Sequence, residues 1–515
     1  MNVRSWGLAV FAAVAAAGCG APKAEKFVDS RVTKALHPEA AAVTRLEIER
    51  RFGTPENLVA WMEFSNAIDF GRIEGKVVPG KGTLDKHQFA VALTSDRPLT
   101  AADVQGLGLI WKSGAYVDAV YEAPKADAKR GVKKGENVPA WFHVGGFQPD
   151  EDNDGQGVLS VNYLLETPVK PGDTFVLVGH RLRSGRKLYM RHCMHCHGYS
   201  GDGQGPTAKY LNPRPRDYRL GKFKFTSTGG PSKASRADLK RIIRKGIPGT
   251  YMPSFLLTFQ DGELRDVVEY VRWLALRGET ERKLALNLYS DYSKEAWAKT
   301  EDSAKQKYQD AYGRWKKGEL PKEPALESFR PQTLLQKYRH EYLQEDLADQ
   351  LKTTTGAWVN AESPNVIVRA KVKRHAATHE SISRGRALFL SKKTLCWSCH
   401  GVSGRGDGYQ TTSFQKNNDP LATSPTRPEP GFYDEWGNKI RPRNLTSGIY
   451  RGGRRPVDIY RRIAVGIKGT PMSGFGTTLS DRQIWDLVNY VFSVPLANNG
   501  ASSSREDGGT HVSRK

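Results

Sequence analysis

The chain has 515 residues and carries 78 Lys and Arg against 55 Asp and Glu, a formal net charge of +23. This length allows several domains, and the basic balance favours anionic membranes or acidic protein partners. A nucleic-acid function is not indicated, because the basic residues are scattered and no nucleic-acid-binding module is recognisable.

The N-terminus has the features of an export signal. Arg4 precedes an apolar run of small residues that ends at Ala17, which is too short to span a bilayer and is typical of a secretory signal. The segment from Ala16 to Cys19 resembles a bacterial lipobox, although the family pattern prefers Leu where Ala16 stands. We therefore expect 1–19 to be a signal segment and Cys19 to be acylated, with ordinary cleavage nearby or an uncleaved anchor as the alternatives. No other stretch reaches about 18 apolar residues, so no further membrane span is expected.

Residues 28–180 contain short β-rich runs separated by Gly, Pro and Asp clusters. This pattern predicts a small β-sandwich or a barrel-like domain. Two segments near its start, Glu47 to Phe52 and Thr54 to Phe64, have helical patterning. Its role is not readable from the residues, and docking to a partner is the simplest hypothesis.

An acidic segment in this region matches part of a calcium-binding loop. Asp150, Asp152 and Asp154 have the spacing of the first ligands of such a loop. The twelfth position is Val161, where the loop requires a bidentate Glu. An acidic turn exposed to solvent is therefore the favoured interpretation, and calcium remains the alternative.

Two C-x-x-C-H runs, Cys193 to His197 and Cys396 to His400, carry the attachment signature of a c-type haem. Two thiols at this spacing reach the two vinyl groups of one porphyrin, and the adjacent His then lies under the iron as its proximal ligand. Zinc is the alternative for paired cysteines, but both pairs carry His at the same next position. The predicted covalent anchors are Cys193, Cys196, Cys396 and Cys399, and the predicted proximal ligands are His197 and His400.

Residues 281–380 between the two haem segments form a predicted helical connector. They are rich in Lys, Glu, Gln and Ala, and helices are expected at about Lys294–Trp315 and Thr333–Leu351. The tail 497–515 is rich in Ser, Gly and Asn and is expected to be disordered.

The two haem segments are copies of one plan. A G-x-x-G-T turn precedes Met252 in the first copy and Met472 in the second. These methionines are 220 positions apart, whereas the two attachment runs are 203 apart, so the second copy carries a net insertion of 17 residues. The insertion falls within Thr411 to Lys439, which is rich in Pro, Asn and Thr and indicates a surface loop.

Each copy resembles a class I cytochrome c domain, with a helix before the attachment run, a Met, and an amphipathic helix at the end. Together the copies resemble the dihaem c-type cytochromes of bacterial respiratory chains, such as the small haem subunits of terminal oxidases. The resemblance covers 181–280 and 381–496. Gly185 and Gly385 in the first helix of each copy allow the last helix to cross closely. Tyr189 and Phe389 are then expected to pack near Tyr270 and Tyr490.

The sixth ligand decides whether each haem carries electrons or performs chemistry. Met252 and Met472 occupy matched positions, and the resemblance implies His/Met ligation of both irons. Core methionines without a ligand role are one alternative. A distal His is the other, with His180, His340, His375 and His379 as candidates.

The resemblance also implies roles near the axial ligands. Pro215 and Pro442 match the family proline that supplies a backbone carbonyl to the proximal His. Arg216 and Arg443 are expected to pair with haem propionates, with exposed, solvated side chains as the alternative.

The sequence thus predicts a multidomain protein in which a β-rich N-terminal domain precedes two mostly α cytochrome c domains joined by a helical connector. With two covalent haem c groups and closed irons, we expect an electron carrier and not an enzyme. It would serve an exported respiratory chain at the periplasmic face, as a membrane-anchored lipoprotein, with a redox protein donor and a terminal oxidase or reductase as acceptor. A dihaem peroxidase-like enzyme and a docking subunit of a larger redox complex are the alternatives.

Overall fold

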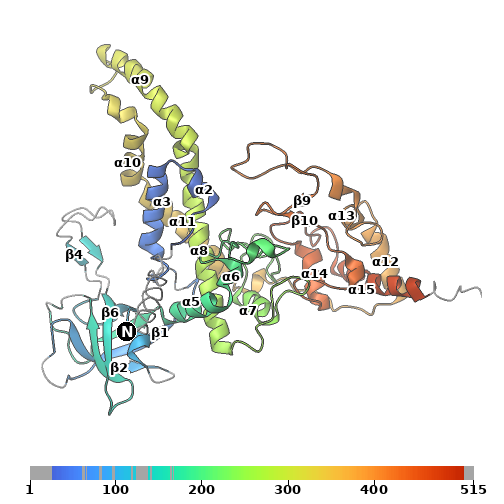
Figure 1. Ribbon diagram of the computed structural model, residues 1–515, viewed down its shortest axis with the longest axis horizontal. Helices are drawn as coiled ribbons and strands as arrows, with labels where there is room; N and C mark the ends of the chain where they lie inside the picture. Colours follow the sequence, from blue (N-terminus) through green and yellow to red (C-terminus); the bar gives the residue numbers. More distant parts are fainter. Residues whose placement is uncertain are drawn as a thin grey trace, which may run out of the picture.

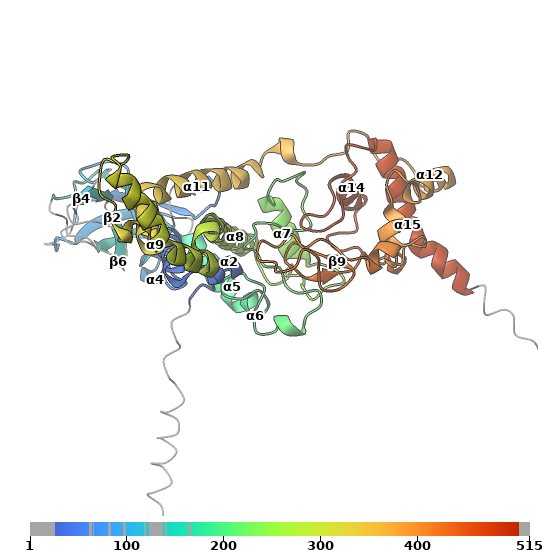
Figure 2. The same ribbon diagram turned by 90° about the horizontal axis from the view of Figure 1, so that it is seen from above.

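The computed structural model describes residues 26–60, 64, 66–80, 84–95, 99–117, 120–122, 137–139, 142–162, 165 and 167–503. The predicted signal segment 1–19, with Cys19, lies outside these residues. Figure 1 shows a β-barrel, a projecting helical arm and two α-helical parts, and Figure 2 shows the barrel and the C-terminal part at opposite ends. In the part of the chain that is described, no helix combines the length and apolar character needed to cross a bilayer.

The β-rich region is a closed, fully antiparallel six-stranded barrel, in the order β1-β2-β7-β6-β3-β8. Its side chains alternate between a buried and a more exposed face, as period-two patterning requires. The predicted β-rich domain is confirmed, and its barrel alternative is the one adopted. Its strands are β1 Arg72–Val77, β2 Gln88–Thr94, β3 Gly108–Trp111, β6 Phe142–Pro149, β7 Gln156–Val161 and β8 Thr174–Val178. The short elements beside it are α4 Ala101–Val104 and the separate pair β4 Val120–Glu122 and β5 Asn137–Pro139.

The barrel has an aromatic core of its own. Phe89, Trp111 and Phe175 meet with ring centroids 5.3–5.8 Å apart, and all three side chains are buried. The acidic segment after β6 forms the turn into β7, where Asp150 accepts hydrogen bonds from the Asp152 amide and the Asn153 side chain. Among the described residues, no three acidic, His or Cys side chains gather in a way that could hold a metal ion.

The residues before the barrel belong to a different core. Helices α2 (Arg31–Ala35) and α3 (Pro38–Phe52) pack against the long helix α8 (Asp261–Tyr292), and Phe52 contacts Trp273 at 5.8 Å. The expected helix at Thr54 to Phe64 is wrong for the residues described there. A bridge between Gly53 and Leu58 turns the chain back instead, because Gly53 has a positive φ of 72° and ends α3.

Each haem segment is built on a pair of crossing helices. In the first domain α5 (His180–His192) crosses α8, and in the second α12 (His379–Phe389) crosses α15 (Asp481–Ser503). A Cβ atom at Gly185 would lie 2.1 Å from the Asp266 carbonyl oxygen, and one at Gly385 would lie 2.1 Å from that of Asp486. The close crossing predicted from these glycines is confirmed. So is the packing of Tyr189 on Tyr270 and of Phe389 on Tyr490, each at 5.2 Å.

Four short helices complete the two domains in matched positions. In each domain one helix holds the attachment run and another precedes the Met-bearing turn. They are α6 Met194–His197 and α7 Arg236–Lys245 in the first domain, and α13 Cys396–His400 and α14 Pro456–Val465 in the second. Helix α15 continues to Ser503, so the start of the predicted disordered tail, 497–503, is helical. Residues 504–515 lie outside the described residues.

The connector is helical, as expected, but it does not begin at residue 281. Helix α8 runs unbroken for 32 residues through that point, and α9 (Lys294–Lys316) follows as the arm that projects in Figure 1. The expected helix Thr333–Leu351 is two helices, α10 (Pro331–Glu341) and α11 (Leu343–Asn360). They are separate because the backbone at Tyr342 leaves the helical region, with φ −122° and ψ −32°.

The insertion in the second domain is not simply a surface loop. Its end forms a small hairpin of β9 (Phe432–Tyr433) and β10 (Lys439–Ile440) that reaches the first domain. There the carboxylate of Asp434, buried in this hairpin, lies 2.9 Å from Lys224 Nζ. The composition of the insertion could not reveal this contact, because Lys224 and Asp434 lie far apart in the sequence.

Candidate functional site: two attachment motifs on one cavity

Both C-x-x-C-H runs line one cavity of about 1330 Å³ between the first and the second domain. Its wall includes the cysteines and the His of each run, and both matched methionines. The structure therefore brings together Cys193, Cys196, His197, Met252, Cys396, Cys399, His400 and Met472. The apolar part of the wall comes from residues such as Leu239, Ile243, Val271, Ile463 and Leu487.

The two proximal histidines are oriented in the same way. His197 Nδ1 lies 3.1 Å from the Arg216 carbonyl oxygen, and His400 Nδ1 lies 3.0 Å from that of Arg443. As donors to these carbonyls, the Nδ1 atoms leave Nε2 of each ring free to bind a metal. Burial lowers the pKa of His197 to about 4 and also lowers that of His400, so both rings are neutral near pH 7.

The carbonyls that accept these hydrogen bonds differ from the expectation. They belong to Arg216 and Arg443, whereas Pro215 and Pro442 were expected to supply them. The proline carbonyls point elsewhere, since Cβ atoms built on Gly203 and Gly406 would lie 2.7 and 2.5 Å from them. Successive carbonyls of an extended segment point in opposite directions, so only one of each adjacent pair can face the imidazole.

The cysteine thiols lie where the sequence requires them. None of the four is in a disulfide. Cys193 ends helix α5, and burial raises the pKa of its thiol to about 12. Cys196 Sγ is 3.3 Å from Thr207 Oγ1, and Cys399 Sγ is 3.4 Å from Gln410 Oε1. Each pair spans one turn of a short helix, which presents both sulfurs to the same cavity.

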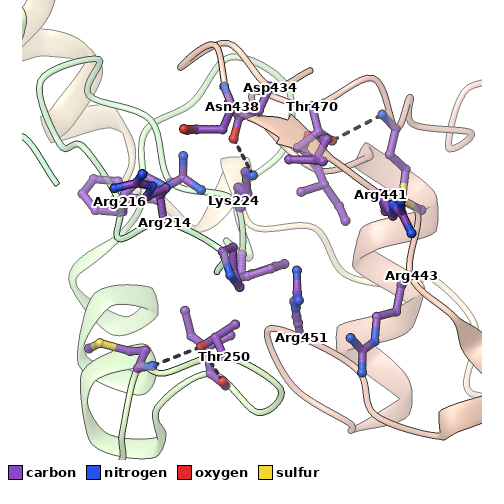
Figure 3. Close-up of a pocket in the computed structure, with 18 of the residues that line it drawn as sticks. Arg214, Arg216, Lys224, Thr250, Asp434, Asn438, Arg441, Arg443, Arg451 and Thr470 are labelled. Atoms are coloured by element: carbon purple, nitrogen blue, oxygen red, sulfur yellow. Dashed lines mark hydrogen bonds and ion pairs between the residues drawn. The ribbon is translucent and has the colours of Figure 1, made fainter. Parts of the chain in front are cut away.

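The two Met-bearing turns have the same hydrogen bonds. Thr250 Oγ1 donates to the Ile247 carbonyl at 2.7 Å and accepts from the Met252 amide at 3.1 Å. Thr470 makes the matching bonds to Ile467 and Met472, at 2.8 and 3.3 Å. Each turn is closed by the Ile amide donating back to the Met carbonyl. The turn therefore holds each Met in the cavity wall, and Figure 3 shows Thr250 and Thr470, whose side chains close the two turns.

The histidines considered as alternative distal ligands lie elsewhere. The cavity wall contains none of His180, His340, His375 and His379. Nε2 of His375 lies 2.8 Å from the Asp486 carboxylate, on the helix pair of the second domain. His192 and His195 do line the cavity, but His192 directly precedes the first attachment run and His195 lies within it.

The cavity wall is strongly basic. It contains ten Lys and Arg side chains but only two acidic ones, Asp434 and Glu429. Figure 3 shows Arg214 and Arg216 on one wall and Arg441, Arg443 and Arg451 on the other. Burial lowers the pKa of Arg216 to about 10 and has the same effect on Arg462. The basic residues are Arg191, Lys209, Arg214, Arg216, Lys224, Lys439, Arg441, Arg443, Arg451 and Arg462.

Two aromatic residues at the site were missed from the sequence. The Tyr218 ring stacks on His197, with centroids 4.9 Å apart and planes 22° apart. The matched position in the second domain is Leu445, so the repeat gave no signal for it. Trp436 lies over the Arg216 guanidinium at 3.7 Å, and it comes from the insertion, which has no counterpart in the first domain.

These residues fit covalently bound haem. Paired thiols reach two vinyl groups, a neutral imidazole and a thioether suit the two axial positions, and arginines suit the propionates. A wall that combines apolar side chains with cations matches an amphipathic porphyrin. The alternative of exposed, solvated arginines does not apply to Arg216, whose guanidinium lies under the Trp436 ring.

Comparison with known proteins agrees with this geometry. Residues 180–271 match the family model of cbb3-type cytochrome c oxidase subunit III, and residues 382–495 match the model of cytochrome c. No curated protein matches the chain significantly. One solved structure, from a reducing HAO-like protein complex of Kuenenia stuttgartiensis, is 24% identical with a TM-score of 0.37, over 61% of this chain and 96% of that one.

Proposed function

With two cytochrome c domains and one covalently bound haem c in each, the chain is a dihaem c-type cytochrome, and from this premise we propose that it relays single electrons without transforming a substrate. When bound, each haem c supplies an iron that cycles between Fe(II) and Fe(III). The observation that carries the proposal is the matched pair of rigid Met turns in the wall of one shared cavity. They favour closed coordination at both sites.

The chain's own residues would tune the potential upwards. A thioether sulfur is a soft ligand that favours Fe(II), so with His197 and Met252 holding one iron and His400 and Met472 the other, the reduction potential would be raised. The cations of the wall act in the same direction, since positive charge near the iron favours the less positive reduced state. The carbonyls of Arg216 and Arg443 fix the tautomer and the plane of each imidazole.

We further propose that the electrons pass to a terminal oxidase or another respiratory complex. The name of the family matched by 180–271, a cbb3-type oxidase subunit, supports this class of acceptor. Export to the periplasmic face and anchoring through an acylated Cys19 are part of the same proposal. The apolar N-terminal run and the lipobox-like segment support them.

The proposal is tested by redox titration of the purified full-length protein. Two one-electron steps at clearly positive potentials are expected, with low-spin spectra in both oxidation states. The reduced native protein should not bind carbon monoxide. Haems that a mild reductant fails to reduce would contradict electron relay, and a high-spin component or carbon monoxide binding would instead favour the peroxidase-like alternative.

Docking into a larger complex is a second candidate role, for the β-barrel. No described residue of the barrel lies in the cavity wall, and the barrel's core is separate from that of the first domain. It can therefore serve association without affecting the haem sites. Loss of complex association on removal of the barrel, with intact haem spectra, would support this role.

A further inference from the structure

Trp436 lies at the turn of the β9–β10 hairpin and contacts both domains. Its indole Nε1–H donates to the Asp217 carbonyl oxygen of the first domain at 2.9 Å. Its ring covers the Arg216 guanidinium at 3.7 Å. The other edge of the indole rests on Gly469 of the second domain, where a Cβ atom would lie 2.4 Å from Cζ3 of the ring.

The two segments that Trp436 contacts are those that hold axial ligands. Arg216 is the residue whose carbonyl accepts the hydrogen bond from His197. Gly469 belongs to the turn that carries Met472, next to Thr470, whose side chain fixes that turn. One side chain therefore connects the proximal side of the first site to the distal side of the second.

We propose that Trp436 is a positioning residue that couples the two haem sites, by holding Arg216 against the first site and the Met472 turn against the second. The inference rests on the proposed function, in which electrons pass between the two sites. The step is a one-electron transfer from ferrous iron in one domain to ferric iron in the other. One iron is oxidised as the other is reduced, and no bond or proton is exchanged.

The physical effect of the indole acts mainly on the first site. A guanidinium covered by an aromatic ring is held by a cation–π interaction and is shielded from water. In this position its charge stabilises Fe(II) in the first domain, because the surrounding wall screens it less than bulk water would. Without the indole the guanidinium is free to turn towards solvent, and its effect on the first site falls.

The hairpin has other contacts that keep it in place when Trp436 is changed. Lys224 pairs with Asp434 at 2.9 Å, and Lys222 pairs with Glu435. In the same interface Lys468 Nζ lies 2.8 Å from Thr228 Oγ1. A Trp436 variant should therefore keep the two domains together and lose only the contacts of the indole ring with Arg216 and Gly469.

The test compares W436L and W436F with the wild-type full-length protein by spectroelectrochemical titration. W315L, on the projecting helix α9, is the matched control for loss of a tryptophan far from the cavity. We expect W436L to lower the equilibrium constant for placing the electron on the first haem and not on the second by about tenfold. For a one-electron couple this is a fall of about 59 mV in the potential of the first haem relative to that of the second. W436F keeps a ring over Arg216, so a smaller shift in the same direction is expected.

A second readout does not depend on haem chemistry. Hydrogen exchange of the turn 466–472 should become faster in W436L and remain unchanged in W315L. Identical potentials and identical exchange in W436L and wild type would overturn the inference, as would an equal shift of both haems. If W436L does not mature, the shift in W436F decides in the same way.

Failure of this inference differs from failure of the proposed function. If the wild-type protein itself binds carbon monoxide or resists mild reductants, the relay is wrong whatever the variants do. If the wild-type protein passes both tests and the Trp436 variants behave like it, only the coupling role is wrong.

Discussion

At the scale of single residues, the two methionines have separable effects. M252A or M472A should open one coordination position and leave the other site closed. Each variant is then expected to bind one equivalent of carbon monoxide when reduced, to show a high-spin component, and to lower the potential of one haem, because the soft ligand that favours Fe(II) is lost. Optical titration with carbon monoxide measures this. If either variant kept two closed haems, the assignment of that Met as a ligand would be wrong.

Two aspartates at matched positions on the last helices have opposite environments. Burial opposes ionisation of Asp486, but hydrogen bonds from Arg384, Ser381 and His375 outweigh it and lower its pKa. Burial raises the pKa of Asp266, the matched residue in the first domain. A carboxylate with a lowered pKa stabilises the fold above its unfolded value of about 3.9, and this stability is lost as the pH falls through the folded value.

The prediction is therefore specific to one helix pair. D486N should destabilise the α12–α15 pair by about 1.5–3 kcal/mol at pH 7, since hydrogen bonds to a charged group are lost. The difference from wild type should shrink as the pH falls below about 4. D266N is the control, because removing a charge that burial disfavours costs little. Amide exchange measures the local stability, in α12 and α15 for D486N and in α5 and α8 for D266N, and equal effects of both substitutions would refute this account.

At the scale of elements, the helix crossings depend on the absence of one methyl group. G385A would place its Cβ 2.1 Å from the Asp486 carbonyl, and backbone cannot move aside as a flexible side chain can. We expect a loss of about 1–3 kcal/mol from this overpacking. G356A on α11 is the matched control, because no atom lies within 4 Å of its Cβ position and Ala favours helix over Gly. Thermal unfolding should show opposite signs for the two variants.

The elements that could be predicted are those set by local pattern and by the repeat. The crossing glycines, the Met turns and the attachment helices each occur twice. The pattern in one copy therefore supports the same structural prediction in the other. The failures have non-local causes. The expected helix after Gly53 is replaced by a turn back to Leu58, and the hairpin around Trp436 docks on a domain about 200 residues earlier in the chain. Neither the composition nor the periodicity of those segments indicates which residues they contact.

At the scale of the whole molecule, helix α8 is the common support. It crosses α5 in the first haem domain, and it also packs with α2, α3 and α11. The shared cavity follows from this arrangement, since the segment after α11 pairs with the first domain through the bridge between Thr228 and Ile367. The sequence predicted two separate haem domains, and only the fold shows that they face each other.

The barrel enters and leaves the rest of the chain at one point. The Arg181 amide donates to the Phe70 carbonyl at 3.0 Å, and the first strand pairs with the last, with Arg72 opposite Val178. Residues before this point, in α2 and α3, are part of the core of the first domain. A truncation of everything before 180 would therefore damage that domain, whereas excision of 73–177 alone should not.

We expect a variant in which a short Gly-Ser linker replaces 73–177 to fold and to mature with two haems. Its potentials should match those of the full-length protein, because none of the residues described within 73–177 lines the cavity. If the barrel is the docking module, association with the membrane partner falls while reduction by a small-molecule donor is unchanged. The matched control keeps the signal segment, removes 28–70 with α2 and α3, and should fail to mature. Altered haem potentials in the excised variant would show instead that the barrel acts on the first haem site through α5, which follows β8 directly.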